Sequence, residues 1–181
     1  MAKRVFRIVL FLLVGTGLAY VAWRLAPGRG TNGVGTTLAD STAVGVRAAS
    51  LYYGNEEGER WVVESREIVE RDGLHAQASA LLEALAEGPR GPGVATVPAA
   101  TKLSHAYALE GGELVLDLSK DFVQGLAGGS RTEEVAVGSI VRTMAANLPN
   151  VRRVRIVCQG PLVSAGGHVP LDRPLDPLDW P

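Results

Sequence analysis

Residues 130–158 read SRTEEVAVGSIVRTMAANLPNVRRVRIVC, and this stretch predicts a helix followed by a strand. Ser130 and Glu133 have the spacing of a capping box, so we expect the helix to begin near Thr132. Pro149 ends the helix, because proline cannot continue it. The apolar face of the helix consists of Val137, Ile140, Val141, Met144 and Leu148. The stretch therefore predicts an amphipathic helix that covers a hydrophobic core.

The strand Val151–Cys158 alternates between apolar and basic side chains. Its apolar face consists of Val154, Ile156 and Cys158. Arg153 and Arg155 lie on the opposite face, which we expect to face water. These two arginines form a small basic strip, which could bind an acidic partner or an anionic glycan. It also protects an exposed strand against pairing with other chains.

Other parts of the chain predict five more strands and one more helix. The strands are Ser50–Tyr53, Trp61–Ile68, Thr101–Leu109, Glu113–Leu118 and Leu162–Val169. The helix lies between Leu74 and Leu85, with Asp72 at its N-cap position and Gly88 and Pro89 as its stop. The order β-β-α-β-β-α-β-(β) predicts an α+β fold, in which two amphipathic helices pack on a small, largely antiparallel sheet.

The N-terminus has the composition of a membrane-targeting segment. Residues 1–7 are basic, and residues 8–25 are uncharged apart from Arg24. Because basic residues precede the apolar stretch, we expect the N-terminus to stay in the cytoplasm and the body to be exported. Residues 8–25 therefore predict a single-pass anchor in a bacterial cytoplasmic membrane. Cleavage after Ala19, as in a signal peptide, is the alternative.

The exported part divides into a linker and one domain. Residues 26–48 are rich in Gly, Thr and Ser without periodicity, which predicts a flexible linker. Residues 49–178 are long enough for one hydrophobic core. The first 24 residues hold four of the 18 basic residues and none of the 19 acidic ones, so the remainder is acidic, which argues against nucleic acid as a partner. The single cysteine, Cys158, excludes an intramolecular disulfide and a cysteine-based metal centre, and we expect no cofactor.

Several segments together resemble the GerMN domain, which is named for bacterial germination and sporulation proteins. They include LYYGNEEGERWVVESREI at 51–68, LDLSKDF at 116–122, NVRRVRI at 150–156 and GGHVPLDRPL at 166–175. The resemblance covers about residues 50–175 in a single copy. It implies a cell-envelope module that acts by protein–protein interaction in sporulation, germination or cell-wall assembly, without catalysis.

The LDLSKDF segment combines two aspartates with a serine, as some active sites do. We interpret it as structural instead. Ser119 is expected to cap a short helical turn after the strand, and Phe122 to pack inward. In the family motif, Asp117, Ser119 and Phe122 are therefore assigned structural roles.

The histidines leave an alternative function open. The chain has three: His75, His105 and His168. An envelope hydrolase or a carbohydrate-binding domain would use His105, Asp117 or His168, and would need two of them to converge in a pocket. The three histidines lack metal-ligand spacing. We expect His105 in the core, because it shares its predicted strand face with Leu103 and Tyr107.

We therefore expect a non-catalytic interaction module, which is attached to the cytoplasmic membrane by its N-terminal helix and binds an envelope protein. An exposed sheet edge or face would give affinity without chemistry. Self-assembly into a ring or array is a further alternative, because small α+β modules can associate edge to edge.

Overall fold

The structure is a computed structural model that describes residues 45–126, 129–159, 169, 171 and 173–180. The predicted N-terminal segment, the membrane segment and nearly all of the predicted linker lie outside these residues. So does the predicted last strand, apart from Val169. None of the described helices has the length and hydrophobicity needed to cross a membrane.

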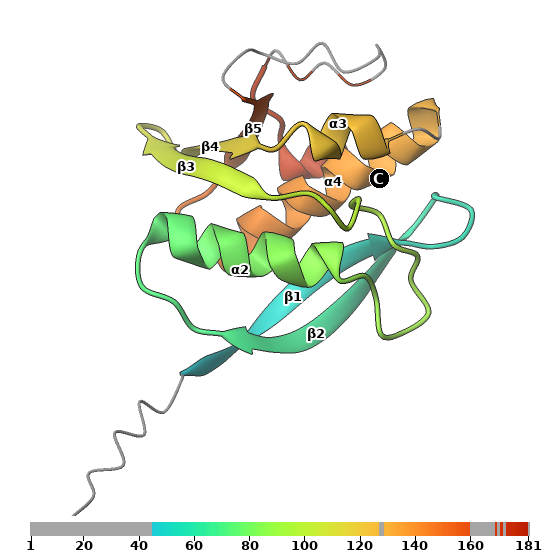
Figure 1. Cartoon of the computed structure of the whole chain (residues 1–181), viewed down its shortest axis with the longest axis horizontal. Coiled ribbons are helices and arrows are strands. Elements are labelled where there is room, and N and C mark those ends of the chain that lie inside the picture. Colours follow the sequence, from blue (N-terminus) through green and yellow to red (C-terminus); the bar gives the residue numbers. More distant parts are fainter. Residues whose placement is uncertain (1–44, 127–128, 160–168, 170, 172, 181) are drawn as a thin grey trace, which may run out of the picture. The chain divides into compact units, whose positions relative to one another are not determined.

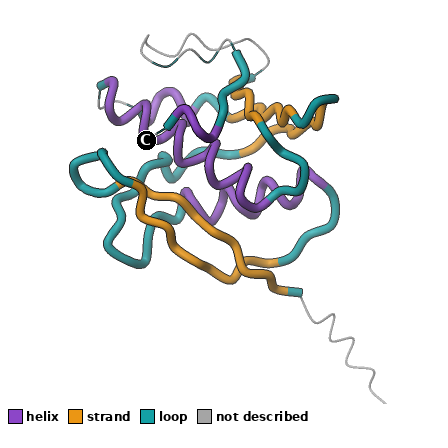
Figure 2. The backbone as a smooth tube through the Cα atoms, turned by 180° about the vertical axis from the view of Figure 1, so that it is seen from behind, coloured by secondary structure: helices purple, strands orange, loops and turns teal. Residues whose placement is uncertain are grey.

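The described elements follow the predicted order (Figures 1 and 2). The strands are β1 (Val46–Gly54), β2 (Trp61–Val69), β3 (Leu103–Leu109), β4 (Glu113–Leu118) and β5 (Arg153–Cys158). The helices are α2 (Leu74–Ala86), α3 (Asp121–Gly125) and α4 (Ser130–Asn147), with a 3-10 turn η1 (Pro177–Asp179) near the C-terminus. β1 thus begins inside the predicted linker.

The structure confirms the α+β class and divides the strands between two sheets. β1 and β2 form an antiparallel hairpin, and β3, β4 and β5 form a second sheet in that order. The pairing of β3 with β4 is antiparallel, whereas β4 and β5 are parallel, because α4 carries the chain back between them. In Figure 1, α2 lies between the hairpin below and the three-stranded sheet above.

Side chains of α4 close the outer edge of β1, which explains why the two sheets stay separate. The amide of Asn147 accepts a hydrogen bond from the Ser50 N–H (2.9 Å) and donates one to the Ser50 carbonyl (2.8 Å). One turn earlier, the Thr143 hydroxyl accepts from the Tyr52 N–H (3.1 Å). The Ser139 hydroxyl donates to the Tyr52 carbonyl. The helix therefore takes the place that a neighbouring strand would occupy.

Both long helices and both sheets contribute to one hydrophobic core. The predicted alternation in β4 is confirmed, since its three leucines are fully buried. The largest fully buried side chains include Tyr53, Phe122, Leu81, Leu116, Ile140, Met144 and Ile156. The apolar face of α4 predicted from the sequence therefore lies in the core.

The starts of both long helices differ from the prediction. Gly73, with φ of 83°, precedes α2, so Asp72 is not its N-cap residue. Gly129, with φ of 88°, precedes α4, and Ser130 is already the first helical residue. The predicted capping box is therefore wrong. A positive φ favours glycine, and in each case the glycine turns the chain into the helix one residue away from the expected polar cap.

Candidate functional site

The outer face of the three-stranded sheet carries several of the predicted site residues. A register shift between Leu103 and His105 interrupts the alternation of β3. His105 therefore pairs with Asp117 on the outer face, while Leu103 pairs with Leu118 on the core side. The His105 side chain is 62% exposed, so the expectation that it lies in the core is wrong.

The structure brings His105 and Asp117 together without enclosing them. His105 Nδ1 lies 3.7 Å from Asp117 Oδ2, and its ring stacks on Tyr107 with 5.9 Å between ring centroids. Neither His105 nor Asp117 lines a pocket described below, and His168 lies outside the described residues. Within residues 45–126 and 129–159 and the described C-terminal positions, no three His, Cys, Asp or Glu side chains form a group suited to a metal ion.

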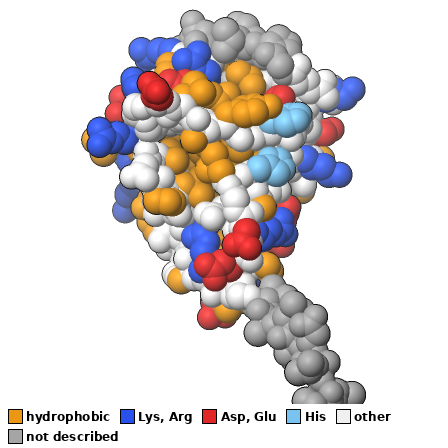
Figure 3. Space-filling model, turned by 90° about the vertical axis from the view of Figure 1, so that its left-hand side faces the viewer, with side chains coloured by type: hydrophobic (Ala, Val, Ile, Leu, Met, Phe, Trp, Pro, Cys, Tyr) orange, Lys and Arg blue, Asp and Glu red, His pale blue; other side chains and the backbone are white. Residues whose placement is uncertain are grey.

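Hydrophobic side chains gather near histidine side chains on the face shown in Figure 3. The described residues also form a groove with a partly hydrophobic lining. The groove is formed by the first turn of α2, the β3–β4 turn and the α4–β5 connection, with about 850 Å³ of space including its open side. Leu74, Leu109 and Val151 contribute apolar lining. Neither His75 nor His105 lines it, so the groove offers a surface for contact without a catalytic pair.

The two predicted arginines of β5 differ in their surroundings. Arg155 Nε donates to Glu113 Oε1 at 2.7 Å, and both side chains are at least 70% buried. Arg153 is exposed. Glu113 of the neighbouring strand β4 therefore compensates the charge of Arg155 but not that of Arg153. The predicted role of these two arginines in binding stays a prediction.

The LDLSKDF segment joins two strands. The Ser119 hydroxyl accepts a hydrogen bond from the Lys102 N–H (3.1 Å), which links the end of β4 to the start of β3. α3 has no side-chain cap, so the expected capping by Ser119 is wrong. The Ser119 carbonyl accepts from the Phe122 N–H (3.1 Å), and the Phe122 ring is fully buried.

The thiol of Cys158 lies on the buried face of β5. Burial, helped by the Asp117 carboxylate, raises the pKa of this thiol to about 11. The protonated form therefore dominates at neutral pH, and it is the less reactive form.

We expect the folded chain to react slowly with a thiol reagent at about pH 8, and the unfolded chain to react fast. Because the folded-state pKa of Cys158 lies above its ordinary value of 9.0, the folded state keeps this proton to higher pH. The free energy of unfolding should accordingly fall as the pH rises from about 9 towards about 11. Alkylation rates with and without urea test the first point, and a Cys158→Ala variant that shows the same alkaline loss would contradict the second.

An aromatic–arginine cluster was not anticipated from the sequence. The Arg142 guanidinium carbon lies 5.8 Å from the Tyr52 ring centroid and 5.3 Å from that of Trp61. The same guanidinium donates to the carbonyl of Trp180. The available signal was that the chain has only three tryptophans, one of them in its last two residues.

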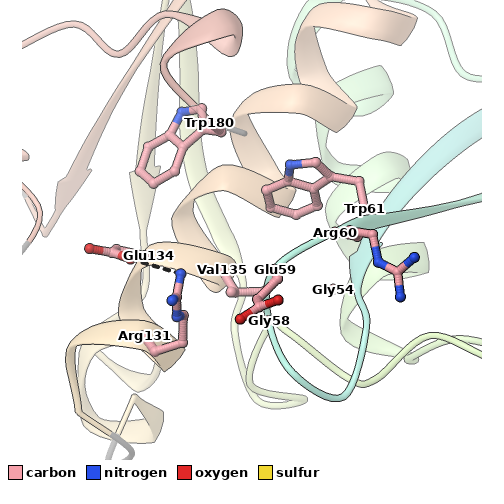
Figure 4. A pocket seen from close by; sticks show the side chains of 9 residues that line it. All are labelled: Gly54, Gly58, Glu59, Arg60, Trp61, Arg131, Glu134, Val135 and Trp180. Carbon is pink, nitrogen blue, oxygen red and sulfur yellow. Dashed lines mark ion pairs between the residues drawn. The ribbon is translucent and has the colours of Figure 1, made fainter.

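Trp61 and Trp180 line a pocket, which we call the tryptophan pocket (Figure 4). It contains about 330 Å³ of space, including the part open to solvent. In Figure 4 the two indoles lie in the upper part, and Arg131 and Glu134 lie at the lower left, with Val135 between these groups. Gly58, Glu59 and Arg60 of the β1–β2 turn also line the pocket.

Gly138 allows both indoles to lie against α4. A Cβ atom at this position would lie 2.8 Å from Trp61 Cη2 and 3.0 Å from Trp180 Cδ2. These distances are too short for ordinary packing. Because glycine has no side chain, Gly138 leaves room for the two indole rings against α4.

Comparison with known proteins shows which family this chain is related to. The sequence model of the Germane family, described as sporulation and spore germination, matches residues 50–163. The chain belongs to the Germane family. Trp61 and Arg142 lie within the Germane match, whereas Trp180 lies beyond it. The family is described by two cellular processes and not by a reaction.

Solved structures agree with the Germane assignment. A protein described as a lipoprotein, from Clostridium perfringens, is 25% identical, with a TM-score of 0.52, and the alignment covers 76% of this chain and 92% of that one. The first GerMN domain of the sporulation protein GerM from Bacillus subtilis is 18% identical, with a TM-score of 0.53 and coverages of 72% and 97%. The tandem GerMN domains of the same protein give 16% identity, a TM-score of 0.53 and coverages of 72% and 45%. No curated protein matches the chain significantly.

Proposed function

We propose that this chain is a non-catalytic protein of the cell envelope that displays its Germane domain outside the cytoplasmic membrane and binds a partner protein there. Its process would be sporulation, germination or cell-wall assembly. Three observations support this: the family description, the lipoprotein description of a similar structure, and the apolar residues 8–25. The N-terminus would stay in the cytoplasm as a single-pass anchor.

The observation that carries the proposal is an open strand edge on β2. Ser50 and Tyr52 direct their backbone groups to α4, so they are not hydrogen-bonded to the residues that they face on β2. Those residues are Ser65 and Val63. In an antiparallel pair, the backbone groups of Ser65 and Val63 must then also point outward, away from β1. In the described part of the chain, no strand pairs with that side of β2.

The side chains along this edge suit the addition of an extended partner segment. Val63 is 55% exposed and Val69 is 42% exposed. Main-chain hydrogen bonds along an open edge provide affinity, and alternate side chains provide specificity. The corresponding edge of β1 is closed by α4, so β2 is the side of the hairpin on which a strand can be added.

In-cell photo-crosslinking tests this function. A photo-reactive residue at Val63 should capture an envelope protein, and the matched position Gln124, which is exposed on α3, should not. Ser65→Pro removes an outward N–H without removing a bond to β1, because proline is tolerated where the N–H faces away from the sheet. We expect the adduct at Val63 to disappear in this variant.

Three outcomes would contradict the proposal. The first is an adduct that persists in Ser65→Pro, since the edge would then not be the binding site. The second is an adduct between two copies of the chain, which would assign the edge to self-association. The third is recovery of the native protein from the cytosol and not from the membrane fraction.

A further inference from the structure

We propose that the C-terminal turn η1 of one copy of this chain docks into the groove between α2, the β3–β4 turn and the α4–β5 connection of a second copy. Leu178 lies against the apolar lining of the groove in this contact, and Asp179 pairs with Arg152. The two surfaces belong to different parts of the chain, so the contact is head-to-tail and can continue to a third copy. Because it does not involve β2, the contact goes beyond the proposed function.

The turn η1 presents an apolar side chain next to a carboxylate. Leu178 is 88% exposed, more than any other large hydrophobic side chain in the described part of the chain. Asp179 beside it is also exposed, and it makes no ion pair with the residues that the structure describes. The Asp176 carboxylate accepts a hydrogen bond from the Leu178 N–H (2.9 Å), which holds the turn in place. The two side chains are therefore presented in a fixed arrangement.

The groove has room for the leucine and offers it apolar contacts. Leu74, Leu109 and Val151 contribute to the lining, and about 430 Å³ of the groove is open to water-sized molecules. This volume lies within the range of about 300–1,000 Å³ for pockets that hold small molecules. Leu109 is itself 51% exposed, so docking removes apolar surface from water on both copies.

The charge at the groove favours a carboxylate. The charged residues that line it are Glu113 and Arg152. The Glu113 carboxylate already accepts a hydrogen bond from Arg155 Nε at 2.7 Å. Arg152 is exposed and makes no ion pair within the described residues. The groove thus combines apolar lining with one uncompensated cation, which complements the leucine and carboxylate of η1.

Within one copy, η1 is held away from the groove. Trp180, which follows the turn, packs against Gly138, and its carbonyl accepts a hydrogen bond from Arg142. No residue of η1 lines the groove of its own chain. The turn therefore reaches a groove only in a second copy. One leucine and one ion pair make a small contact, and the shared membrane of the proposed function would favour it by raising the local concentration of copies.

Cysteine crosslinking between two differently tagged full-length copies tests the contact in cells. One copy carries Pro177→Cys and the other Ala108→Cys, an exposed position that lines the groove. A short, membrane-permeant bis-maleimide should join the two tags in one adduct. The matched control replaces Ala108→Cys by Ala48→Cys, which is also an exposed strand position but does not line the groove. The native Cys158 is buried and should add little background.

Substitutions of exposed side chains then test the chemistry of the contact without affecting the fold. Leu178→Ser should lower the adduct yield by about tenfold, because the leucine no longer buries its side chain. Arg152→Glu in the groove copy should lower it by about fivefold, the effect of one exposed ion pair. Asp179→Arg in the other copy should do the same, and the two reversals together should restore the yield.

Two outcomes would overturn the proposal. One is an equal adduct yield with Ala108→Cys and with Ala48→Cys. The other is a combined Arg152→Glu and Asp179→Arg pair that yields no more adduct than either reversal alone. The tagged copies are scored wherever the chain is located in the cell, so failure here is distinct from failure of the crosslinking test of β2.

Discussion

Replacing Arg66 by methionine is expected to remove about 3–5 kcal/mol from the free energy of unfolding, the cost of breaking a buried ion pair from one side. Arg66 is only 5% exposed. Its guanidinium donates to the carbonyls of Ala84 and Gly88, each at 2.8 Å, and from Nε to Glu64 at 2.9 Å. The guanidinium thus satisfies carbonyls at the C-terminal end of α2, where a positive charge is also favoured by the helix dipole.

Glu64 would be left without its main charged partner in this variant. Burial acts to raise the pKa of Glu64, but hydrogen bonds from the Arg90 N–H and from Arg66 outweigh it and lower the pKa below its usual value. A lowered folded-state pKa stabilises the fold above the unfolded-state pKa, and this stabilisation is lost as the pH falls through the folded-state value. The difference between Arg66→Met and the unmodified chain should therefore shrink in acid.

Urea unfolding measures the loss, and Arg71→Met is the matched control. Arg71 also contacts a glutamate, Glu83, at 2.9 Å, but the two side chains are 38% and 54% exposed. An exposed pair of this kind contributes about 0–1 kcal/mol. If Arg66→Met and Arg71→Met lost the same amount, the proposed structural role of Arg66 would be wrong.

The second large effect is expected for Gly138→Ala, which should destabilise the fold by about 1–3 kcal/mol, the usual cost of overpacking. In an exposed helix, the same change would stabilise by about 1 kcal/mol, because alanine is the better helix former. Here the added Cβ meets Trp61 at 2.8 Å and Trp180 at 3.0 Å. Both indoles would have to move, and the tryptophan pocket would change shape with them.

Thermal or urea unfolding, combined with tryptophan fluorescence, tests this expectation. Ala146→Gly in the same helix is the control, because Ala146 is exposed and reports helix propensity alone. We expect both Gly138→Ala and Ala146→Gly to destabilise, although one adds the methyl group that the other removes. A gain in stability for Gly138→Ala, with unchanged fluorescence, would show that the indoles do not depend on this glycine.

The described elements were predictable because their signals are local. The leucines of β4 alternate, and the apolar residues of α4 recur at helical spacing, so each pattern identifies both an element and its buried face. Alternation along the strand gave the wrong face for His105, because a register shift in β3 places its side chain on the outer face of the sheet. Nothing in the alternation of Leu103, His105 and Tyr107 signals that shift, because it depends on how β3 pairs with β4.

The candidate site was less predictable than the fold. The sequence predicted that Ser119 of LDLSKDF caps a helical turn, but its hydroxyl accepts a hydrogen bond from Lys102 at the start of β3 and joins two strands instead. The cluster around Arg142 joins β1, β2, α4 and the C-terminus. Trp180 lies two residues beyond the predicted end of the domain at residue 178, so no periodic pattern could connect it with Trp61.

The amino-acid sequence by itself determined the order of the elements, the α+β class, the buried faces of α4 and β4, and the Germane relationship, because each depends on residues close together in the chain. Only the tertiary structure decided that α4 closes β1 and leaves β2 open, that Arg66 is buried, and that two tryptophans meet over Gly138. The deciding contacts join distant residues, such as Ser50 and Asn147, which are 97 positions apart. Local periodicity carries no information about such pairs, since they form only when the helices and sheets pack together.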